Sequence, residues 1–343
     1  MAEPVRVLIA SPLEAELVDR VARVDTRLEV LYEPDLLPRP RYPSDHGGTS
    51  PALTSMDQER WSALLASAEV SLDADWRAPA DLATTAPALR WVQATSAGIG
   101  QFLERTGLDR SGITFTTAAG VHAVPLAEFA LTGVLHIAKG VPLLLARQRE
   151  RHWERYATGS VRGRRAVVIG LGTIGRETCA LLAAAGLEVW GVGRPGRTYD
   201  VPATARLVDT DALDEVLPSA DVVVLACPLT EQTRGLLSRA RIDLLPPGAI
   251  IVNIARGQVL DEMALIDALE AGRLGGAALD VFTIEPLPSD SPLWGRPDVL
   301  ISPHSASTLP SENAAIVHLF CDNLRRYLDG RPLRNRYHRE DGY

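Results

Sequence analysis

The sequence predicts an α/β protein with two domains, in which parallel sheets are covered by helices. Three observations lead to this class. The chain has 343 residues, more than twice the length of a typical domain of ~150 residues. Short apolar runs alternate with longer helical patterns in both halves of the chain, as in parallel sheets. One apolar run ends in a glycine-rich turn that opens a helical pattern.

Composition and charge exclude several classes of protein. With 46% hydrophobic and 23% charged residues, the chain has the balance of a globular protein rather than a disordered one. The net charge of −8 argues against a nucleic-acid partner, because such partners need a basic face. Three scattered cysteines, Cys179, Cys227 and Cys321, fit neither a disulfide framework nor a zinc site, so no metal is expected.

No apolar run approaches the ~18 residues that span a bilayer. The N-terminal residues lead directly into a strand-like run and lack the long apolar core of a signal peptide. We therefore expect a cytoplasmic protein without a membrane partner.

The first half of the chain contains one series of strands and one long irregular segment. Glu33–Leu53 carries five prolines and the pair Gly47-Gly48, so it is predicted to be a loop. Such a loop is either a cover for a substrate or a plain surface insertion. The predicted strands are Val5–Ala10, Leu28–Tyr32, Glu69–Leu72, Leu89–Gln93 and Ile113–Thr117.

The second half repeats the alternation after a long helix predicted over Pro125–Arg151. His122 lies just before that helix and is either a substrate contact or an ordinary helix-start residue. A last helix is predicted at Glu312–Leu328, with Gly330 as its stop. The strands of this half are predicted at Ala166–Gly170, Leu187–Val192, Asp221–Ala226, Ile250–Ile254, Gly276–Val281 and Val299–Ile301.

A phosphate-binding turn is predicted where the first strand of the second half ends. The segment Gly170-Leu171-Gly172-Thr173-Ile174-Gly175 is a G-x-G-x-x-G sequence between a buried strand and a helix. Gly170 permits the tight turn, Gly172 lets the backbone approach a pyrophosphate, and Gly175 lets the helix pack against the sheet. The N-terminus of the helix adds N–H groups and a positive dipole end. The sequence therefore predicts dinucleotide binding.

The next strand indicates which dinucleotide is preferred. Enzymes that use NAD usually place an acidic residue there, about 20 residues after the fingerprint, to bind the ribose hydroxyls. Here Arg194 takes that place, with Arg197 three residues further, and no carboxylate occurs in Gly191–Arg197. Arginine can bind a 2′-phosphate with two charge-assisted hydrogen bonds. We therefore expect a preference for NADP(H), with NAD(H) as the alternative.

Chemically active residues follow three further strands of the second half. They are Arg256 in Asn253-Ile254-Ala255-Arg256-Gly257, Glu285 after Leu279-Asp280-Val281-Phe282, and His304 in Ser302-Pro303-His304. Ligands of open parallel sheets bind at the carboxyl ends of the strands, so these side chains are predicted to meet there.

Taken together, these motifs resemble those of the NAD(P)-dependent D-2-hydroxyacid dehydrogenases, with glyoxylate/hydroxypyruvate reductases as the most similar type. The resemblance covers about Ala94 to Arg331 well and the first 90 residues only in pattern. It implies that His304 is the general acid–base, that Glu285 orients it, and that Arg256 binds the substrate carboxylate.

The same resemblance implies further binding residues. Backbone N–H groups of Ala97 and Gly98, in the loop Ser96–Gly100, are expected to hold the substrate carboxylate. Asp280 is expected to meet the nicotinamide amide. The other expected cofactor-binding residues are Gly170, Gly172, Thr173, Ile174, Gly175, Arg194, Arg197, Cys227, Pro228, Thr233 and Ile254.

The resemblance also implies an architecture and an activity. Two Rossmann/flavodoxin-like doubly wound lobes are expected with a cleft between them: a discontinuous substrate-binding domain, residues 1–97 and 308–343, and a dinucleotide-binding domain, residues 98–307. We expect an NADP(H)-preferring 2-keto acid reductase, a homodimer, with glyoxylate or hydroxypyruvate as leading substrates. The alternative is a dinucleotide-sensing regulatory protein, similar to the corepressors of this fold, with little turnover.

Overall fold

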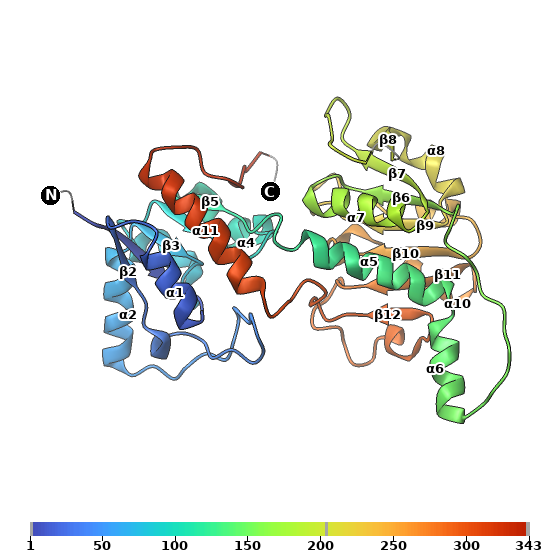
Figure 1. The fold of residues 1–343 in the computed structure, drawn as a ribbon, viewed down its shortest axis with the longest axis horizontal. Coiled ribbons are helices and arrows are strands. Elements are labelled where there is room, and N and C mark those ends of the chain that lie inside the picture. Colours follow the sequence, from blue (N-terminus) through green and yellow to red (C-terminus); the bar gives the residue numbers. More distant parts are fainter. Residues whose placement is uncertain (1–2, 203–204, 341–343) are drawn as a thin grey trace. The chain divides into compact units, whose positions relative to one another are not determined.

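The computed structural model describes residues 3–202 and 205–340 and divides into two compact units (Figure 1). One unit comprises Met1–His122 and Thr308–Tyr343, and the other Ala123–Ser307. The predicted boundary between residues 97 and 98 is therefore wrong, because residues 98–122 belong to the first unit. The reason is that strand β5 (Thr114–Thr116) pairs in parallel with β4 (Trp91–Gln93) and completes the first sheet.

The first unit contains a five-stranded parallel sheet in the order β2-β1-β3-β4-β5. Helices cover both faces. A core on one face includes Trp61 and Leu103, and a core on the other includes Leu17 and Phe320. The remaining strands are β1 (Val5–Ile9), β2 (Leu28–Leu31) and β3 (Val70–Leu72). The helices are α1 (Ala15–Ala22), α2 (Ser55–Ser67), α3 (Leu82–Thr85), α4 (Gly100–Thr106) and α11 (Glu312–Leu328).

Helix α11 joins the first sheet although it lies at the other end of the chain. The apolar side chains Ile316, Val317 and Phe320 are buried in the core that it shares with α1. Asn323, fully buried, donates a 3.1 Å hydrogen bond from Nδ2 to Oε1 of Gln93 on β4. A buried amide with a partner stabilises one orientation of the helix, because any other orientation leaves a polar group unsatisfied.

The second unit contains a seven-stranded parallel sheet in the order β12-β11-β10-β9-β6-β7-β8. The chain starts at β6 in the interior of the sheet, builds to one side through β7 and β8, and returns to build the other side from β9. Ligands bind at such a reversal of strand order. The strands are β6 (Arg165–Ile169), β7 (Glu188–Gly193), β8 (Arg206–Asp209), β9 (Val222–Leu225), β10 (Ala249–Asn253), β11 (Leu274–Leu279) and β12 (Val299–Ile301).

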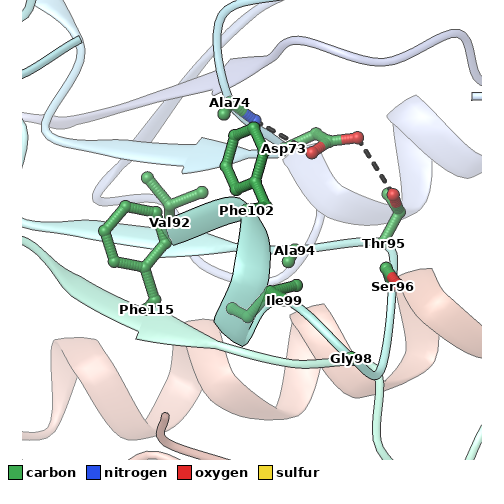
Figure 2. A pocket seen from close by; sticks show the side chains of 10 residues that line it. All are labelled: Asp73, Ala74, Val92, Ala94, Thr95, Ser96, Gly98, Ile99, Phe102 and Phe115. Carbon is green, nitrogen blue, oxygen red and sulfur yellow. Dashed lines mark hydrogen bonds between the residues drawn. The ribbon is translucent and has the colours of Figure 1, made fainter. Parts of the chain in front are cut away.

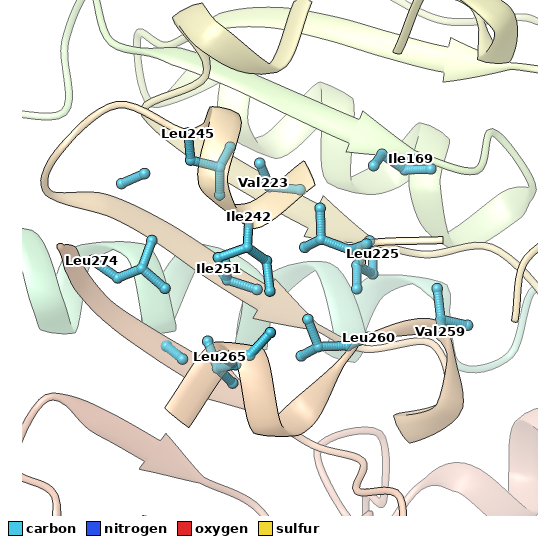
Figure 3. Packing of buried hydrophobic residues seen from close by; sticks show 14 of the residues in the cluster. Ile169, Val223, Leu225, Ile242, Leu245, Ile251, Val259, Leu260, Leu265 and Leu274 are labelled. Atoms are coloured by element: carbon cyan, nitrogen blue, oxygen red, sulfur yellow. The ribbon is translucent and has the colours of Figure 1, made fainter. Parts of the chain in front are cut away.

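Helices α5 (Ala123–Ala138) and α7 (Thr173–Ala184) cover one face of this sheet, and α8 (Leu213–Val216), α9 (Arg239–Leu244) and α10 (Glu262–Glu270) cover the other. Figure 3 shows the second core, where Val223 and Ile251 of the central strands pack against Ile242 and Leu265 of the helices. These continuous apolar strands are typical of a parallel sheet that is buried on both faces. The rigid sheet fixes the positions of the loops at its carboxyl edge.

Two expectations about the second unit differ from the structure. Strand β8 was not predicted, because it is an edge strand whose residues face solvent, with Leu207 47% exposed. The single helix predicted over Pro125–Arg151 is two helices, α5 and α6 (Val141–Glu150), bent by 61°. Gly140 allows the bend because its φ of 61° lies in the left-handed region. Among the described residues, no single helix is long and apolar enough to span a membrane; α5 and α6 reach the required length and composition only when the two bent helices are taken together.

Candidate active site

The turn between β6 and α7 forms the cradle predicted from its glycines. Gly170 has a φ of 101°, and a Cβ there would lie 2.6 Å from the backbone of Cys227. A Cβ on Gly175 would overlap the carbonyl of Gly170. A Cβ on Gly172, the N-cap of α7, would meet no atom within 4 Å. The turn is therefore tight where it packs against protein and open at Gly172, which fits the approach of a pyrophosphate to the N–H groups of Thr173 and Ile174.

The loop after β9 lies next to this turn. Thr233 braces the loop: its hydroxyl donates to the carbonyl of Pro228 at 2.6 Å and accepts the N–H of Thr230 at 2.7 Å. Cys227 is buried at the start of the loop, and Ile254 is buried after β10. Burial raises the pKa of the Cys227 thiol to about 12, so this cysteine is not a nucleophile at neutral pH.

The end of β7 carries the two arginines that indicate the choice of dinucleotide. Arg194 is partly exposed, and its backbone N–H donates to the Tyr199 hydroxyl at 2.9 Å. Arg197 is exposed. The structure also shows a carboxylate that the sequence reasoning missed: Asp209, the last residue of β8, is in register with Gly193. Its signal was hidden because β8 itself was not recognised.

Arg256 is placed by the loop that follows β10. Asn253 holds this loop: its Nδ2 donates to the carbonyl of Arg256 at 3.1 Å, and its Oδ1 accepts the N–H of Ala255 at the same distance. Burial lowers the pKa of Arg256, and the charges of Glu285 and Asp280 raise it in part. The guanidinium remains charged near neutral pH. Asn253 is a positioning residue that its place in the motif did not reveal.

Glu285 and His304 form the pair that the sequence predicts. Nδ1 of His304 lies 2.8 Å from Oε2 of Glu285, and the other carboxylate oxygen accepts the Phe282 N–H at 2.9 Å. Partial burial raises the pKa of Glu285, but the hydrogen bonds from His304 and Phe282, with the charges of His304 and Arg256, outweigh it and hold that pKa below its usual value. Glu285 is therefore an anion at neutral pH and can orient the imidazole ring.

Asp280 shapes the loop that carries His304. This aspartate is only 2% exposed, and its Oδ1 accepts hydrogen bonds from the Ser302 hydroxyl at 2.6 Å and from the N–H groups of Ser305 and Ala306 at 2.8 and 2.9 Å. The His304 N–H also donates to the Asp280 carbonyl at 2.8 Å. His304 has a φ of 52°, an uncommon conformation for a residue other than glycine. One carboxylate thus stabilises the strained turn that presents the histidine.

The first unit contributes a separate loop with its own cavity. Ser96 and Gly98, in the loop after β4, line a cavity of about 230 Å³ together with Thr95 and residues of α4 and β5 (Figure 2). Ala97 is partly exposed and Gly98 is exposed. Asp73 also lines this cavity. The sequence reasoning missed it, although it directly follows a predicted strand.

His122 belongs to a different cluster of the first unit. It is 8% exposed, and its Nε2 lies 3.1 Å from Oε1 of Glu312 at the start of α11. Its partner is thus another residue of the same unit. Among residues 3–202 and 205–340, there is no group of three or more His, Cys, Asp and Glu side chains that could hold a metal ion.

Comparison with known proteins decides the family. Residues 131–306 match the NAD-binding domain of the D-isomer specific 2-hydroxyacid dehydrogenases. The chain belongs to this family. A putative 2-hydroxyacid dehydrogenase of Haemophilus influenzae is 30% identical over 254 residues, which cover 71% of this chain and 78% of that protein. The fold class and the resemblance predicted from the sequence are confirmed.

Other members of the 2-hydroxyacid dehydrogenase family match most of this chain. The solved structure of a D-isomer specific 2-hydroxyacid dehydrogenase from Xanthobacter autotrophicus Py2, in complex with NADPH and MES, is 28% identical with a TM-score of 0.77 and full coverage of both chains. The D-3-phosphoglycerate dehydrogenase of Archaeoglobus fulgidus is 26% identical over 96% of this chain. The chain spans only 58% of the length of that relative.

Proposed function

We propose that this protein is an NADP(H)-preferring D-2-hydroxyacid dehydrogenase that acts as a 2-keto acid reductase. The observation that carries the proposal is the His304–Glu285 pair at 2.8 Å, on loops next to the loop that carries Arg256. These groups follow β10, β11 and β12 at the carboxyl edge of the sheet that also carries the glycine turn. An acid–base group and a cationic carboxylate binder beside a dinucleotide cradle are the elements that hydride transfer to a keto acid requires.

Each residue has one role in the proposed reaction. Glu285 accepts the Nδ1–H of His304, which leaves Nε2 to give a proton to the keto oxygen during reduction and to take it back during oxidation. Arg256 binds the substrate carboxylate and stabilises the charge that develops on the oxygen. The nicotinamide cofactor, when bound, supplies the hydride to the keto carbon. The loop at Ala97 and Gly98 offers backbone N–H groups to the substrate carboxylate.

Several residues of the second unit support a nicotinamide dinucleotide. The cradle for the pyrophosphate consists of Gly170, Gly172, Thr173, Ile174 and Gly175. Arg194 and Arg197 at the end of β7 are suited to a 2′-phosphate, and the similar Xanthobacter protein holds NADPH. Asp209, in register with Gly193, is suited to a ribose hydroxyl, so NAD(H) is the alternative cofactor. The walls of the cofactor site consist of Cys227, Pro228, Thr233 and Ile254. Asp280 is the candidate partner of the nicotinamide amide.

The proposal is tested by following the absorbance of NADPH and NADH in parallel with a panel of 2-keto acids. We expect consumption of NADPH, and consumption of NADH at a kcat/KM at least tenfold lower. Arg194→Asp removes the cation and adds a like charge against a phosphate, so it should raise the KM for NADPH at least tenfold and the KM for NADH by less than threefold. Arg162→Asp, an exposed change just before β6, is the matched control.

The outcomes separate the parts of the proposal. Equal kcat/KM values with NADPH and NADH would leave the reductase assignment in place. They would contradict the assignment of Arg194 to a 2′-phosphate. Tight binding of NADPH with no consumption by any acid would contradict the reductase and support the dinucleotide-sensing alternative.

We also propose that two copies of the chain associate through α6 and the segment after it. This part of the second unit exposes apolar side chains: Leu143, Leu144 and Leu145 are 37–43% exposed, and Trp153 is 96% exposed. A hollow runs between the helix and the segment, lined by Leu144 and Trp153 among others. Large exposed aromatic residues beside an apolar helix face are typical of protein interfaces.

A further inference from the structure

The cavity of the first unit has walls made mainly of carbon. Its lining includes Val92 and Ala94 of β4 and the segment after it, Ile99 and Phe102 at α4, and Phe115 of β5 (Figure 2). Four of these five side chains are buried, while Phe102 is partly exposed. A volume of about 230 Å³ exceeds that of a ~150 Å³ apolar cavity, which is enough to bind benzene. The space can therefore hold a branched aliphatic or aromatic group.

Two of the polar residues at this cavity, Asp73 and Thr95, are hydrogen-bonded to each other. Oδ2 of Asp73 accepts the Thr95 hydroxyl at 2.9 Å, and Oδ1 accepts the Ala74 N–H at 2.9 Å. Asp73 keeps this arrangement in a left-handed conformation with a φ of 69°, a strain that is typical of residues at ligand sites. Because both carboxylate oxygens have partners, the aspartate braces the loop after β4. A ligand therefore meets mostly apolar surface in the interior.

Ser96 and Gly98, which line this cavity, belong to the loop that the proposed function assigns to the substrate carboxylate. Under the proposed function, N–H groups of this loop bind the carboxylate of a 2-keto acid. In such an acid the side chain and the carboxylate are attached to the same carbonyl carbon. A substrate held by its carboxylate at this loop therefore has its side chain close to the loop, where Ser96 and Gly98 line the cavity.

We propose that the substrate is a 2-keto acid with a branched aliphatic or aromatic side chain, which occupies this cavity. The inference rests on the proposed function and adds to it the class of the side chain. It differs from the expectation of glyoxylate or hydroxypyruvate. Glyoxylate has no side chain to fill the space, and burial of the hydroxyl group of hydroxypyruvate is unfavourable unless it finds a partner.

The test compares kcat/KM for 2-ketoisocaproate and phenylpyruvate with kcat/KM for glyoxylate and hydroxypyruvate, using the full chain with saturating NADPH or NADH. Each buried methylene group should raise kcat/KM about fourfold, so we expect the better bulky acid to exceed the better small acid at least tenfold. A ratio below tenfold would overturn the inference while leaving the reductase in place. No oxidation of NADPH or NADH with any of the four acids would instead overturn the proposed function.

A variant that fills the cavity provides a second measurement. Ala74 lines the cavity and is partly exposed, so Ala74→Leu can place three more carbon atoms in the space without disturbing a buried core. We expect the ratio of bulky to small kcat/KM to fall at least tenfold. Ala80→Leu, the same change at an exposed position of the same connection, should leave the ratio within twofold. An unchanged ratio in Ala74→Leu, with an unchanged melting temperature, would overturn the inference.

Discussion

At the scale of single residues, the position of the His304 ring depends on two carboxylates with different tasks. Glu285 touches the ring itself at Nδ1, whereas Asp280 holds the Ser302 hydroxyl before the histidine and the backbone N–H groups of the histidine and of the two residues after it. The buried aspartate costs free energy to desolvate, and its three hydrogen bonds on one oxygen offset that cost. The exposed His304 side chain is thus oriented without being buried.

The role of His304 gives a direct prediction. His304→Ala removes the group that transfers the proton, and a positioned acid–base group contributes about 10²–10⁴-fold to a rate. We expect kcat for 2-keto acid reduction to fall at least a hundredfold. The Kd for NADPH, measured by fluorescence titration, should change less than threefold, because the glycine turn and Arg194 are untouched. Turnover that survives within a few-fold would contradict the acid–base assignment.

Single residues also show what the sequence can and cannot predict. Arg256, Glu285 and His304 could be named because their types and spacings follow predicted strands, and the structure brings Glu285 and His304 to 2.8 Å. Asn253 and Asp73 were missed as positioning residues because their roles are hydrogen bonds to backbone or to a neighbouring hydroxyl. Such bonds depend on the path of the folded loops, which no spacing in the sequence reveals.

At the scale of elements, the loops after β10 and β11 are built against each other. A Cβ on Gly257, directly after Arg256, would coincide with the backbone of Phe282. The side-chain amide of Gln258 donates to the carbonyl of Thr283 at 3.1 Å, and the Thr283 N–H donates to Glu262 at 2.9 Å. This close contact keeps the loop that carries Arg256 next to the loop that carries Glu285.

This contact predicts the effect of one added methyl group. Gly257→Ala forces the two loops apart, and overpacking of this kind costs about 1–3 kcal/mol of stability. We expect a lower melting temperature and a loss of at least tenfold in kcat/KM, most of it in KM because Arg256 binds the carboxylate. The matched control is Gly295→Ala, at a position where a Cβ would meet no atom within 4 Å. Equal melting temperatures and kinetics in the two variants would contradict the argument.

The elements that were predicted and those that were missed differ in burial. The central strands β6, β9 and β10 are continuous apolar runs and were found within one or two residues of their ends. Strand β8 was missed because none of its residues is buried, so its sequence has no alternation of apolar and polar residues. The break between α5 and α6 was missed because the apolar pattern continues across Lys139 and Gly140, and only the left-handed glycine marks it.

At the scale of the whole molecule, each unit has its own sheet with a core on both faces. The presence of two α/β units follows from length and alternation, but the first boundary does not. The sequence of β5 does not show which sheet this strand joins, and its pairing with β4 assigns residues 98–122 to the first unit. Pairing between strands is a long-range property that local patterns do not carry.

The surface of the second unit predicts the assembly of the whole molecule. The proposed association through α6 should give a particle of twice the 37.0 kDa of one chain in analytical ultracentrifugation. A symmetric interface uses the same patch on both copies, so each substitution changes both surfaces of the interface. Leu144→Glu with Trp153→Ala should therefore shift the protein to the mass of one chain at micromolar concentration. Met263→Glu, at a 64% exposed apolar residue of α10 outside this patch, should not. A monomeric wild-type protein, or a dimer that survives both changes, would contradict the assignment of this surface to a second copy.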